Sequence, residues 1–265
     1  MNEPQLADYD YVVINSSSGK DSQTTLRYVA LKAEREGYPK SRMLVAHADL
    51  GDMEWDGVLE LARLQAMTYY GINFRAIARP QGDIIQHVLQ RRMWPSPDNR
   101  WCTSDHKRGQ IAKLFTEVVR SLGGSGKLFR ILNVMGMRAD ESRARAKLKP
   151  FFLNGRATNG KRHVDNWLAI HSWQLPDVWA DIKASGVPYH YAYDLGMPRL
   201  SCKFCIYAPK EALMIAGRRH PATLAQYVET ERAVGHTFRK DFPIAKVQEA
   251  IAAGEDWGPA TDWVM

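Results

Sequence analysis

Residues 11–22 of this chain read Tyr-Val-Val-Ile-Asn-Ser-Ser-Ser-Gly-Lys-Asp-Ser, an apolar run followed by a cluster of small polar residues. The run Tyr11–Asn15 predicts a short β-strand, and the stretch after the cluster, roughly Asp21–Arg35, predicts a helix. Small residues between a strand and a helix let the backbone approach phosphate oxygens closely. The helix N-terminus adds N–H groups and a partial positive charge. This order of elements therefore predicts a phosphate-binding loop.

Side chains of the same loop suit an anion. Lys20 adds a full charge, and Ser17 and Ser22 carry hydroxyl groups that donate hydrogen bonds. Asp21 is unusual in an anion site, which suggests that it holds a Mg²⁺ ion or caps the first helical turn. A plain Ser/Gly turn with an ordinary capping aspartate is the alternative.

Strand-like and helix-like segments alternate over the first half of the chain. Further strands are expected at Met43–Ala48, Phe74–Ala78 and Phe129–Met135, and helices at Trp55–Tyr70, Ile84–Leu89, Asp105–Leu122 and, later, Pro176–Ser185. This alternation with continuous apolar strands predicts an α/β fold, a doubly wound, mainly parallel sheet of Rossmann-like type. Residues Arg138–Arg162 are expected to form a long functional loop, and Pro209–Ala253 to belong to a mainly helical C-terminal extension.

Composition places the chain among ordinary globular proteins and makes it basic. Its 265 residues are 45% hydrophobic and 25% charged, which argues against disorder or a fibrous architecture. The formal net charge of +7 favours polyanionic partners such as nucleotides or nucleic acid. No apolar run is long enough to span a membrane, and Met1–Asp8 has no basic and apolar leader. We therefore expect a cytoplasmic protein with no membrane partner.

Six sequence elements together resemble the phosphoadenosine phosphosulfate reductase family of the PP-loop, or adenine-nucleotide alpha-hydrolase, superfamily. Ser17–Ser22 is similar to the PP-loop S-G-G-K-D-S, with Ser18 in place of the first glycine. The others are His47–Gly51 with Glu54; Arg100-Trp101-Cys102 with Lys107; Gly136-Met137-Arg138 with Glu141, Ser142 and Arg145; the run from Trp173 to Arg199; and Cys202–Cys205. The resemblance implies a PP-loop nucleotide-binding and cysteine domain over residues 1–208 and a helical region over 209–265.

The resemblance also implies roles for individual residues. It assigns the phosphates of ATP or an adenine sulfonucleotide to the loop residues Ser17, Ser18, Gly19, Lys20, Asp21 and Ser22. Asp49 is expected beside the nucleotide, in the same crevice as the loop. Arg138 and Arg145 are expected on its anionic groups, because a guanidinium pairs bidentately with phosphate oxygens. Lys20, Asp21 and Asp49 are the expected catalytic residues, with Mg²⁺ near Asp21.

The three cysteines raise the question of a metal site. An odd count in a reducing compartment excludes a disulfide framework, and Cys202-x-x-Cys205 has the spacing that metals and clusters use. Cys102 falls where adenylylsulfate reductases of the family carry half of a cysteine pair that ligates a [4Fe–4S] cluster. We expect a shared three-cysteine site that favours a [4Fe–4S] cluster over Zn²⁺, with His106 or Asp105 as fourth ligand or one iron left open. Three unrelated buried cysteines are the remaining alternative.

The resemblance predicts an ATP-using enzyme. ATP would be cleaved between its α and β phosphates to AMP and pyrophosphate, and sulfur would pass through the cysteine site to an adenylated acceptor. DNA or tRNA is the expected acceptor, as in the DNA-phosphorothioation branch, and a cysteine desulfurase or another donor would supply sulfur. One alternative is a phosphoadenosine phosphosulfate or adenylylsulfate reductase, although the nucleophilic cysteine that reductases carry near the C-terminus has no counterpart after Cys205. The second alternative is a non-catalytic subunit that binds nucleotide or nucleic acid.

Overall fold

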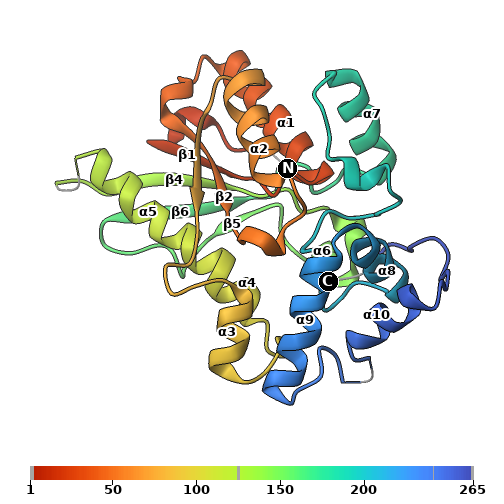
Figure 1. The fold of residues 1–265 in the computed structure, drawn as a ribbon. Helices are drawn as coiled ribbons and strands as arrows, with labels where there is room; N and C mark the ends of the chain where they lie inside the picture. The colour runs from red at the N-terminus through yellow and green to blue at the C-terminus, as the bar shows by residue number, and fades with distance from the viewer. Residues whose placement is uncertain (1–2, 124–125, 241, 264–265) are drawn as a thin grey trace. The chain divides into compact units, whose positions relative to one another are not determined.

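The computed structural model contains a six-stranded sheet in the order β3-β2-β1-β4-β6-β5 (Figure 1). Its strands are β1 (Tyr11–Asn15), β2 (Met43–Ala48), β3 (Asn73–Ile77), β4 (Phe129–Val134), β5 (Phe151–Leu153) and β6 (Arg162–Trp167). All neighbours pair in parallel except β5, which runs antiparallel to β6. The structure describes residues 3–123, 126–240 and 242–263. The fold is the expected mainly parallel α/β sheet.

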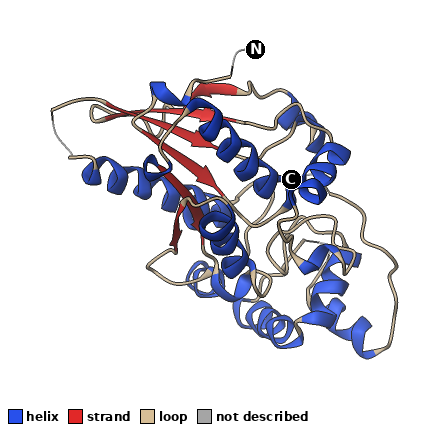
Figure 2. Cartoon of the chain, turned by 90° about the horizontal axis from the view of Figure 1, so that it is seen from above, coloured by secondary structure: helices blue, strands red, loops and turns tan. Residues whose placement is uncertain are grey.

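Helices separate the strands along the chain and continue after the last strand. Figure 2 shows the helices and strands in a second view. They are α1 (Lys20–Glu36), α2 (Val58–Arg63), α3 (Ile84–Arg91), α4 (Trp101–Thr103), α5 (Gly109–Ser121), α6 (Arg143–Ala146), α7 (Leu175–Ser185), α8 (Lys210–Arg219), α9 (Pro221–Val234) and α10 (Ala245–Ala252). Two π-helical stretches, Leu64–Tyr69 and Ser104–Arg108, extend α2 and join α4 to α5. Among the described residues, no helix is both long and apolar enough to span a bilayer.

Apolar side chains cover both faces of the sheet. On one face Val12 and Ile14 of β1 pack with Leu26 and Val29 of α1. On the other face Val13 packs with side chains of α5. The alternation along β1 explains this, because successive strand residues point to opposite faces. Helices on both faces make the sheet doubly wound, as the sequence predicts.

The direction in which strands are added reverses between β1 and β4, which lie side by side in the sheet. At such a switch point the loops after the two strands diverge and leave room for a ligand. The loop after β1 is the expected phosphate loop, and the loop after β4 begins with Gly136. Topology alone therefore brings two of the six sequence elements to one place.

The chain divides into two compact units that are discontinuous in sequence. The first comprises the chain up to Ala48, Gly57–Ile77 and Gln110–His190, and it contains the sheet. The second comprises Asp49–Asp56, Ala78–Gly109 and the chain from Tyr191 onward. These units describe packing, so the expected division into residues 1–208 and 209–265 stays a prediction.

The expected secondary structure is largely confirmed, with one clear error. The strands at Tyr11–Asn15 and Met43–Ala48 have the expected bounds, and the tail is helical. The expected long loop Arg138–Arg162 is wrong, because it contains α6 and β5 and reaches the first residue of β6. Strand β6 carries Arg162, Asp165 and Asn166, all nearly buried, so its sequence does not look like that of a core strand.

Candidate functional site

The loop after β1 is held by its own serines. Ser17 N donates to Ser22 Oγ (3.2 Å), and Ser22 Oγ donates to Gly19 O (2.9 Å). Helix α1 then begins at Lys20, and its N-cap residue Gly19 supplies no side-chain cap. A helix N-terminus without a side-chain cap is suited to an anion, because its first N–H groups lack partners within the helix. The Ser22 hydroxyl shapes the loop, while the backbone and Lys20 supply its positive potential.

Ser18 adopts a backbone conformation that glycine normally supplies. Its φ is +56°, in the left-handed region, and its side chain is completely buried. Ser18 Oγ donates a 2.6 Å hydrogen bond to the carbonyl oxygen of Val58, the first residue of α2. This bond ties the loop to a second helix and offsets the cost of the left-handed backbone. The departure from the family's glycine thus has a structural reason.

We expect Ser18→Ala to lower the free energy of unfolding by about 1–3 kcal/mol, because the Val58 carbonyl loses a donor while the strained backbone remains. Ser18→Gly should cost less, because glycine removes the strain even though it too loses the bond. Urea unfolding of the two variants measures the difference. A glycine variant less stable than the alanine variant would show that the left-handed backbone is not strained here.

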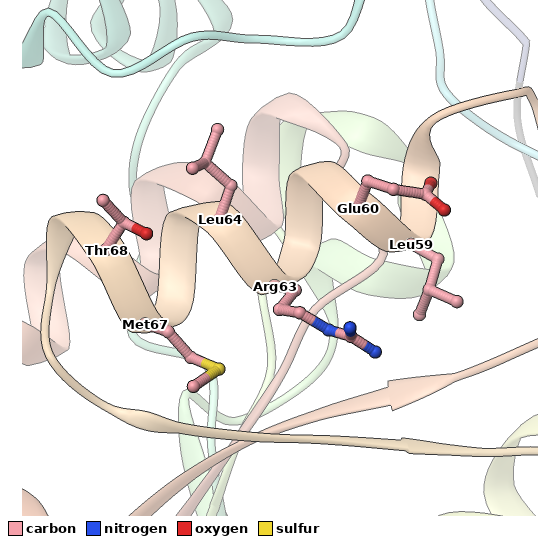
Figure 3. Close-up of a pocket in the computed structure, with 6 residues that line it drawn as sticks. All are labelled: Leu59, Glu60, Arg63, Leu64, Met67 and Thr68. Carbon is pink, nitrogen blue, oxygen red and sulfur yellow. The ribbon is translucent and has the colours of Figure 1, made fainter.

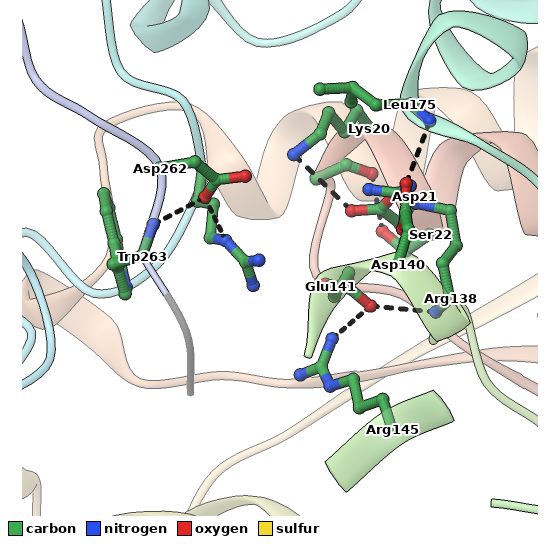
Figure 4. A network of polar contacts seen from close by, with 12 residues as sticks. Lys20, Asp21, Ser22, Arg138, Asp140, Glu141, Arg145, Leu175, Asp262 and Trp263 are labelled. Carbon is green, nitrogen blue, oxygen red and sulfur yellow. Dashed lines mark hydrogen bonds and ion pairs between the residues drawn. The ribbon is translucent and has the colours of Figure 1, made fainter. Parts of the chain in front are cut away.

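Arg138 joins the loop after β4 to the first turn of α1 (Figure 4). Its side chain is 2% exposed, and its Nε donates to Asp21 Oδ1 at 2.5 Å. Its Nη1 contacts both carboxylate oxygens of Asp140, and Asp140 Oδ2 also accepts from the backbone N of Leu175, where α7 begins (3.2 Å). Burial alone would lower the pKa of the guanidinium, but the carboxylates of Asp21 and Asp140 raise it above its ordinary value.

These contacts give protein partners to two arginines and one aspartate that were expected beside the nucleotide, and their roles there stay predictions. Nε and Nη1 of Arg138 donate hydrogen bonds to the carboxylates of Asp21 and Asp140. In this arrangement Arg138 positions Asp21, and these two nitrogen atoms do not contact a bound anion. Asp21 also lies near Lys20 Nζ (3.6 Å), so its carboxylate has two cationic neighbours. The expected Mg²⁺ near Asp21 stays a prediction. Arg145 pairs with Glu141, whose carboxylate also accepts from Arg138 N (2.8 Å).

Gly136 lies where the loop after β4 approaches the first turns of α1. A Cβ atom at this position would come within 2.7 Å of Asp21 O and 2.8 Å of Thr25 Oγ1. The backbone oxygen cannot move without displacing the start of α1, so only glycine allows this approach. Gly136 and Arg138 therefore fix the start of α1 against the loop after β4.

Sequence reasoning missed a ladder of asparagines at the carboxyl ends of the strands. Asn15 Nδ2 donates to Asn133 Oδ1 (2.7 Å), and Asn133 Nδ2 donates to Asn166 Oδ1 (2.7 Å). Asn154 Nδ2 donates to the same oxygen of Asn166 (3.1 Å). The bond from Asn15 Nδ2 to Val134 O (2.8 Å) sets the direction of the chain, because a carbonyl oxygen only accepts. An asparagine near the end of each of three strands was the signal.

Asp49 lies in the second unit, directly after β2. Its Oδ1 accepts from Gly51 N (2.8 Å), which shapes the turn after the strand. Glu54 of the same turn accepts from Leu50 N (3.4 Å). The role of Asp49 beside a nucleotide stays a prediction.

All three cysteines belong to the second unit, and each is partly exposed. All three are coupled to one ammonium group: burial alone would lower the pKa of Lys107, but Cys202, Glu54, Cys205 and Cys102 raise it. Burial raises the pKa of Cys202 to about 12, against the opposing effect of Lys107. Burial also raises the pKa of Cys205. The thiols thus share an electrostatic environment centred on Lys107.

A metal-binding arrangement is a stricter requirement than a shared environment. Within the described residues, no three His, Cys, Asp or Glu side chains are grouped so that they could hold one metal ion. His106, an expected fourth ligand, instead contacts His87 Nδ1 through its Nε2 (3.1 Å) and is 2% exposed. Asp105, the other candidate, accepts from Ser104 Oγ (2.6 Å). As arranged, the side chains do not fit a single-ion site such as Zn²⁺.

A shallow open pocket of about 360 Å³ lies along α2 and its π-helical extension (Figure 3). It is lined by Leu59, Glu60, Arg63, Leu64, Met67 and Thr68. Leu64 and Met67 are 40% and 53% exposed, so the pocket is a surface groove. None of its lining residues is an expected site residue.

Comparisons with known proteins give one family match and two similar solved structures. The family model "Phosphoadenosine phosphosulfate reductase domain" matches residues 11–208. The solved phosphoadenylyl-sulfate (PAPS) reductase from Candida auris, a phosphate complex, is 15% identical with a TM-score of 0.46, and the match covers 74% of this chain and 83% of that one. The FMN adenylyltransferase of Candida glabrata, in complex with FAD and inorganic pyrophosphate, is 13% identical with a TM-score of 0.47, covering 74% and 58%. No match was found among curated proteins.

Proposed function

Because the chain belongs to the phosphoadenosine phosphosulfate reductase domain family, we propose that it binds an adenine nucleotide at residues 16–22 and is an enzyme that uses it. The observation that carries the proposal is the start of α1: a helix without a side-chain cap that follows β1 at the switch point of the sheet. Lys20 is 2% exposed and adds charge at that point. The triphosphate of ATP is the ligand we propose for the N–H groups of this helix N-terminus and the ammonium group of Lys20.

We propose ATP cleavage between the α and β phosphates as the reaction. An acceptor oxygen would attack the α phosphorus, the bond to the β-phosphate oxygen would break, and pyrophosphate would leave. Lys20 and the N–H groups of the loop would stabilise the charge that develops on the departing pyrophosphate. Arg138 would keep Asp21 and the start of α1 in place during this step. A sulfur nucleophile would then displace AMP from the adenylated acceptor.

Cys102, Cys202 and Cys205 are the proposed residues for handling sulfur. Their placement in one unit and their joint effect on Lys107 support a common role. A [4Fe–4S] cluster is the expected group, and when bound it would offer an iron at which a sulfur atom binds. Iron, zinc and acid-labile sulfide analysis of anaerobically purified protein tests this, and Cys202→Ser should lower the metal content. Protein purified anaerobically without iron or zinc would remove metal from the proposal.

Lys20→Ala is expected to weaken ATP binding by about 1–3 kcal/mol, the range of a charge-assisted hydrogen bond. Isothermal calorimetry measures the affinity, and quantification of AMP and pyrophosphate measures turnover with DNA, tRNA or no acceptor. The matched control is Lys183→Ala, which removes an exposed lysine from the same unit. If ATP binds both variants equally well, the loop is not its site.

The family name supports a second candidate function, reduction of a sulfonucleotide. All three cysteines lie at or before Cys205, so the terminal nucleophile of such reductases has no counterpart in this sequence. Release of sulfite from phosphoadenosine phosphosulfate or adenylylsulfate, with a thiol reductant present, would favour the reductase. AMP and pyrophosphate formed from ATP would favour the proposed transferase.

A further inference from the structure

The net positive charge of the protein comes from one segment of the first unit. Ser142–Val164 contains seven Lys and Arg residues and no Asp or Glu. This equals the formal net charge of +7 of the whole chain, whose other residues carry 29 charges of each sign. A concentration of one sign of charge attracts polyanions to that part of a protein.

Two of the seven cations have structural partners. Arg162 is 9% exposed, and it donates from Nε to Ala157 O and from Nη1 to Thr116 Oγ1, both at 2.7 Å. Arg145 pairs with Glu141. The other five are exposed and form no ion pair within the described part of the chain: Arg143, Lys147, Lys149, Arg156 and Lys161. They remain available to an external anion.

Strand β5 carries exposed apolar side chains within the same segment of sequence. Phe151 and Leu153 are 40% and 53% exposed, while Phe152 between them is partly buried. Strand β5 is the last strand in the sheet order and pairs only with β6 among the described strands (Figure 1). The segment thus presents an aromatic ring flanked by cations that precede and follow it in sequence. Proteins that bind unpaired bases combine these features, because a ring stacks on any base while cations contact the backbone.

We propose that Ser142–Val164 is a binding surface for single-stranded nucleic acid, whose phosphates contact the five exposed cations and one of whose bases stacks on Phe151. This inference deepens the proposed function by placing a surface for the acceptor and naming its class. The claim that the bound strand is the acceptor rests on the proposed function. Binding itself requires no ATP. The alternative explanation for these cations is that they prevent the exposed edge of the sheet from pairing with strands of other molecules.

Fluorescence anisotropy of the full-length protein with a labelled single strand, over a salt titration, tests the surface. The variant Lys147→Gln/Lys149→Gln/Arg156→Gln should bind roughly 10- to 100-fold more weakly near 0.1 M salt, with a salt slope smaller by about 2. Phe151→Ala should weaken binding roughly fivefold or more, and weaken binding of the matching duplex less. The control Arg35→Gln/Arg120→Gln/Lys183→Gln removes the same charge from exposed positions elsewhere in the unit and should change affinity little.

Several outcomes would overturn the surface: no binding of the strand, an equal loss in both triple variants, or tighter binding to the duplex. Tighter binding to vesicles of phosphatidylcholine and phosphatidylserine would overturn it as well. Thermal melts of each variant check that the fold is retained. The two proposals fail separately: strand binding without ATP cleavage overturns the function but keeps the surface, and ATP cleavage without strand binding does the reverse.

Discussion

Arg138→Ala is expected to destabilise the protein by about 3–5 kcal/mol, the usual cost of removing one partner from a buried ion pair. The guanidinium is 2% exposed and lies between the carboxylates of Asp21 and Asp140. Without it, two mostly buried negative charges would lie near each other, and among the described residues Lys20 alone pairs with one of them. Urea unfolding monitored by circular dichroism measures the loss.

Two further variants separate charge from geometry at this position. Arg138→Lys keeps the charge, but an ammonium group cannot donate to both carboxylates in the geometry of the planar guanidinium. An intermediate loss of stability is therefore expected. Asp140→Asn removes one charge and keeps an acceptor for Leu175 N. A double-mutant cycle between Arg138→Ala and Asp140→Asn should show a coupling above about 1 kcal/mol. A loss below that size for Arg138→Ala alone would mean that solvent already screens the network.

Acid is expected to destabilise the second unit through His106. Burial, together with His87 and Arg79, lowers the pKa of His106 from 6.5 to about 4. The unfolded chain therefore takes up a proton near pH 6.5, whereas the folded chain does so only near pH 4. Since the unfolded state then binds more protons, stability falls as the pH drops from 6.5 to 4, by at most about 3 kcal/mol.

Urea unfolding at several pH values between 7.5 and 4.5 measures this dependence. His106→Asn should flatten it and also lower stability at neutral pH, because the ring contacts with His87 and Trp101 are lost. The control His236→Gln changes an exposed histidine and should leave the slope unchanged. A slope that survives in His106→Asn would assign the acid sensitivity to other groups.

The order of the elements could be predicted from sequence because apolar runs alternate with helical spacing. Strands β1 and β2 consist mostly of apolar residues, so their bounds follow from composition. Strand β6 could not be found in this way: its Asp165 accepts from Tyr9 Oη (2.9 Å), and its Arg162 donates to Ala157 and Thr116. The partners that make these polar residues tolerable in a core become visible only after folding.

Residue types in the site were easier to predict than their partners. An arginine beside a phosphate loop can pair with a phosphate or with a carboxylate, and the sequence does not say which lies closer. In the folded chain Arg138 meets Asp21, although 117 positions separate them. Likewise His106 is near Cys102 in sequence, yet its Nε2 contacts His87. In both cases the partner lies far away in sequence, and local spacing contains no information about such a partner.

The asparagine ladder has a consequence for how this sequence can evolve. Asn15 donates to Asn133, and Asn133 in turn donates to Asn166, in a direction set by the carbonyl of Val134. An aspartate at Asn133 would have no donor for Asn166 and would place a charge in the sheet. Substitutions at these strand ends are therefore expected to be epistatic: the protein tolerates one of them only after the hydrogen-bonding partner on the adjacent strand has been replaced. In a randomised library, the surviving residues at these positions should covary in pairs across adjacent strands.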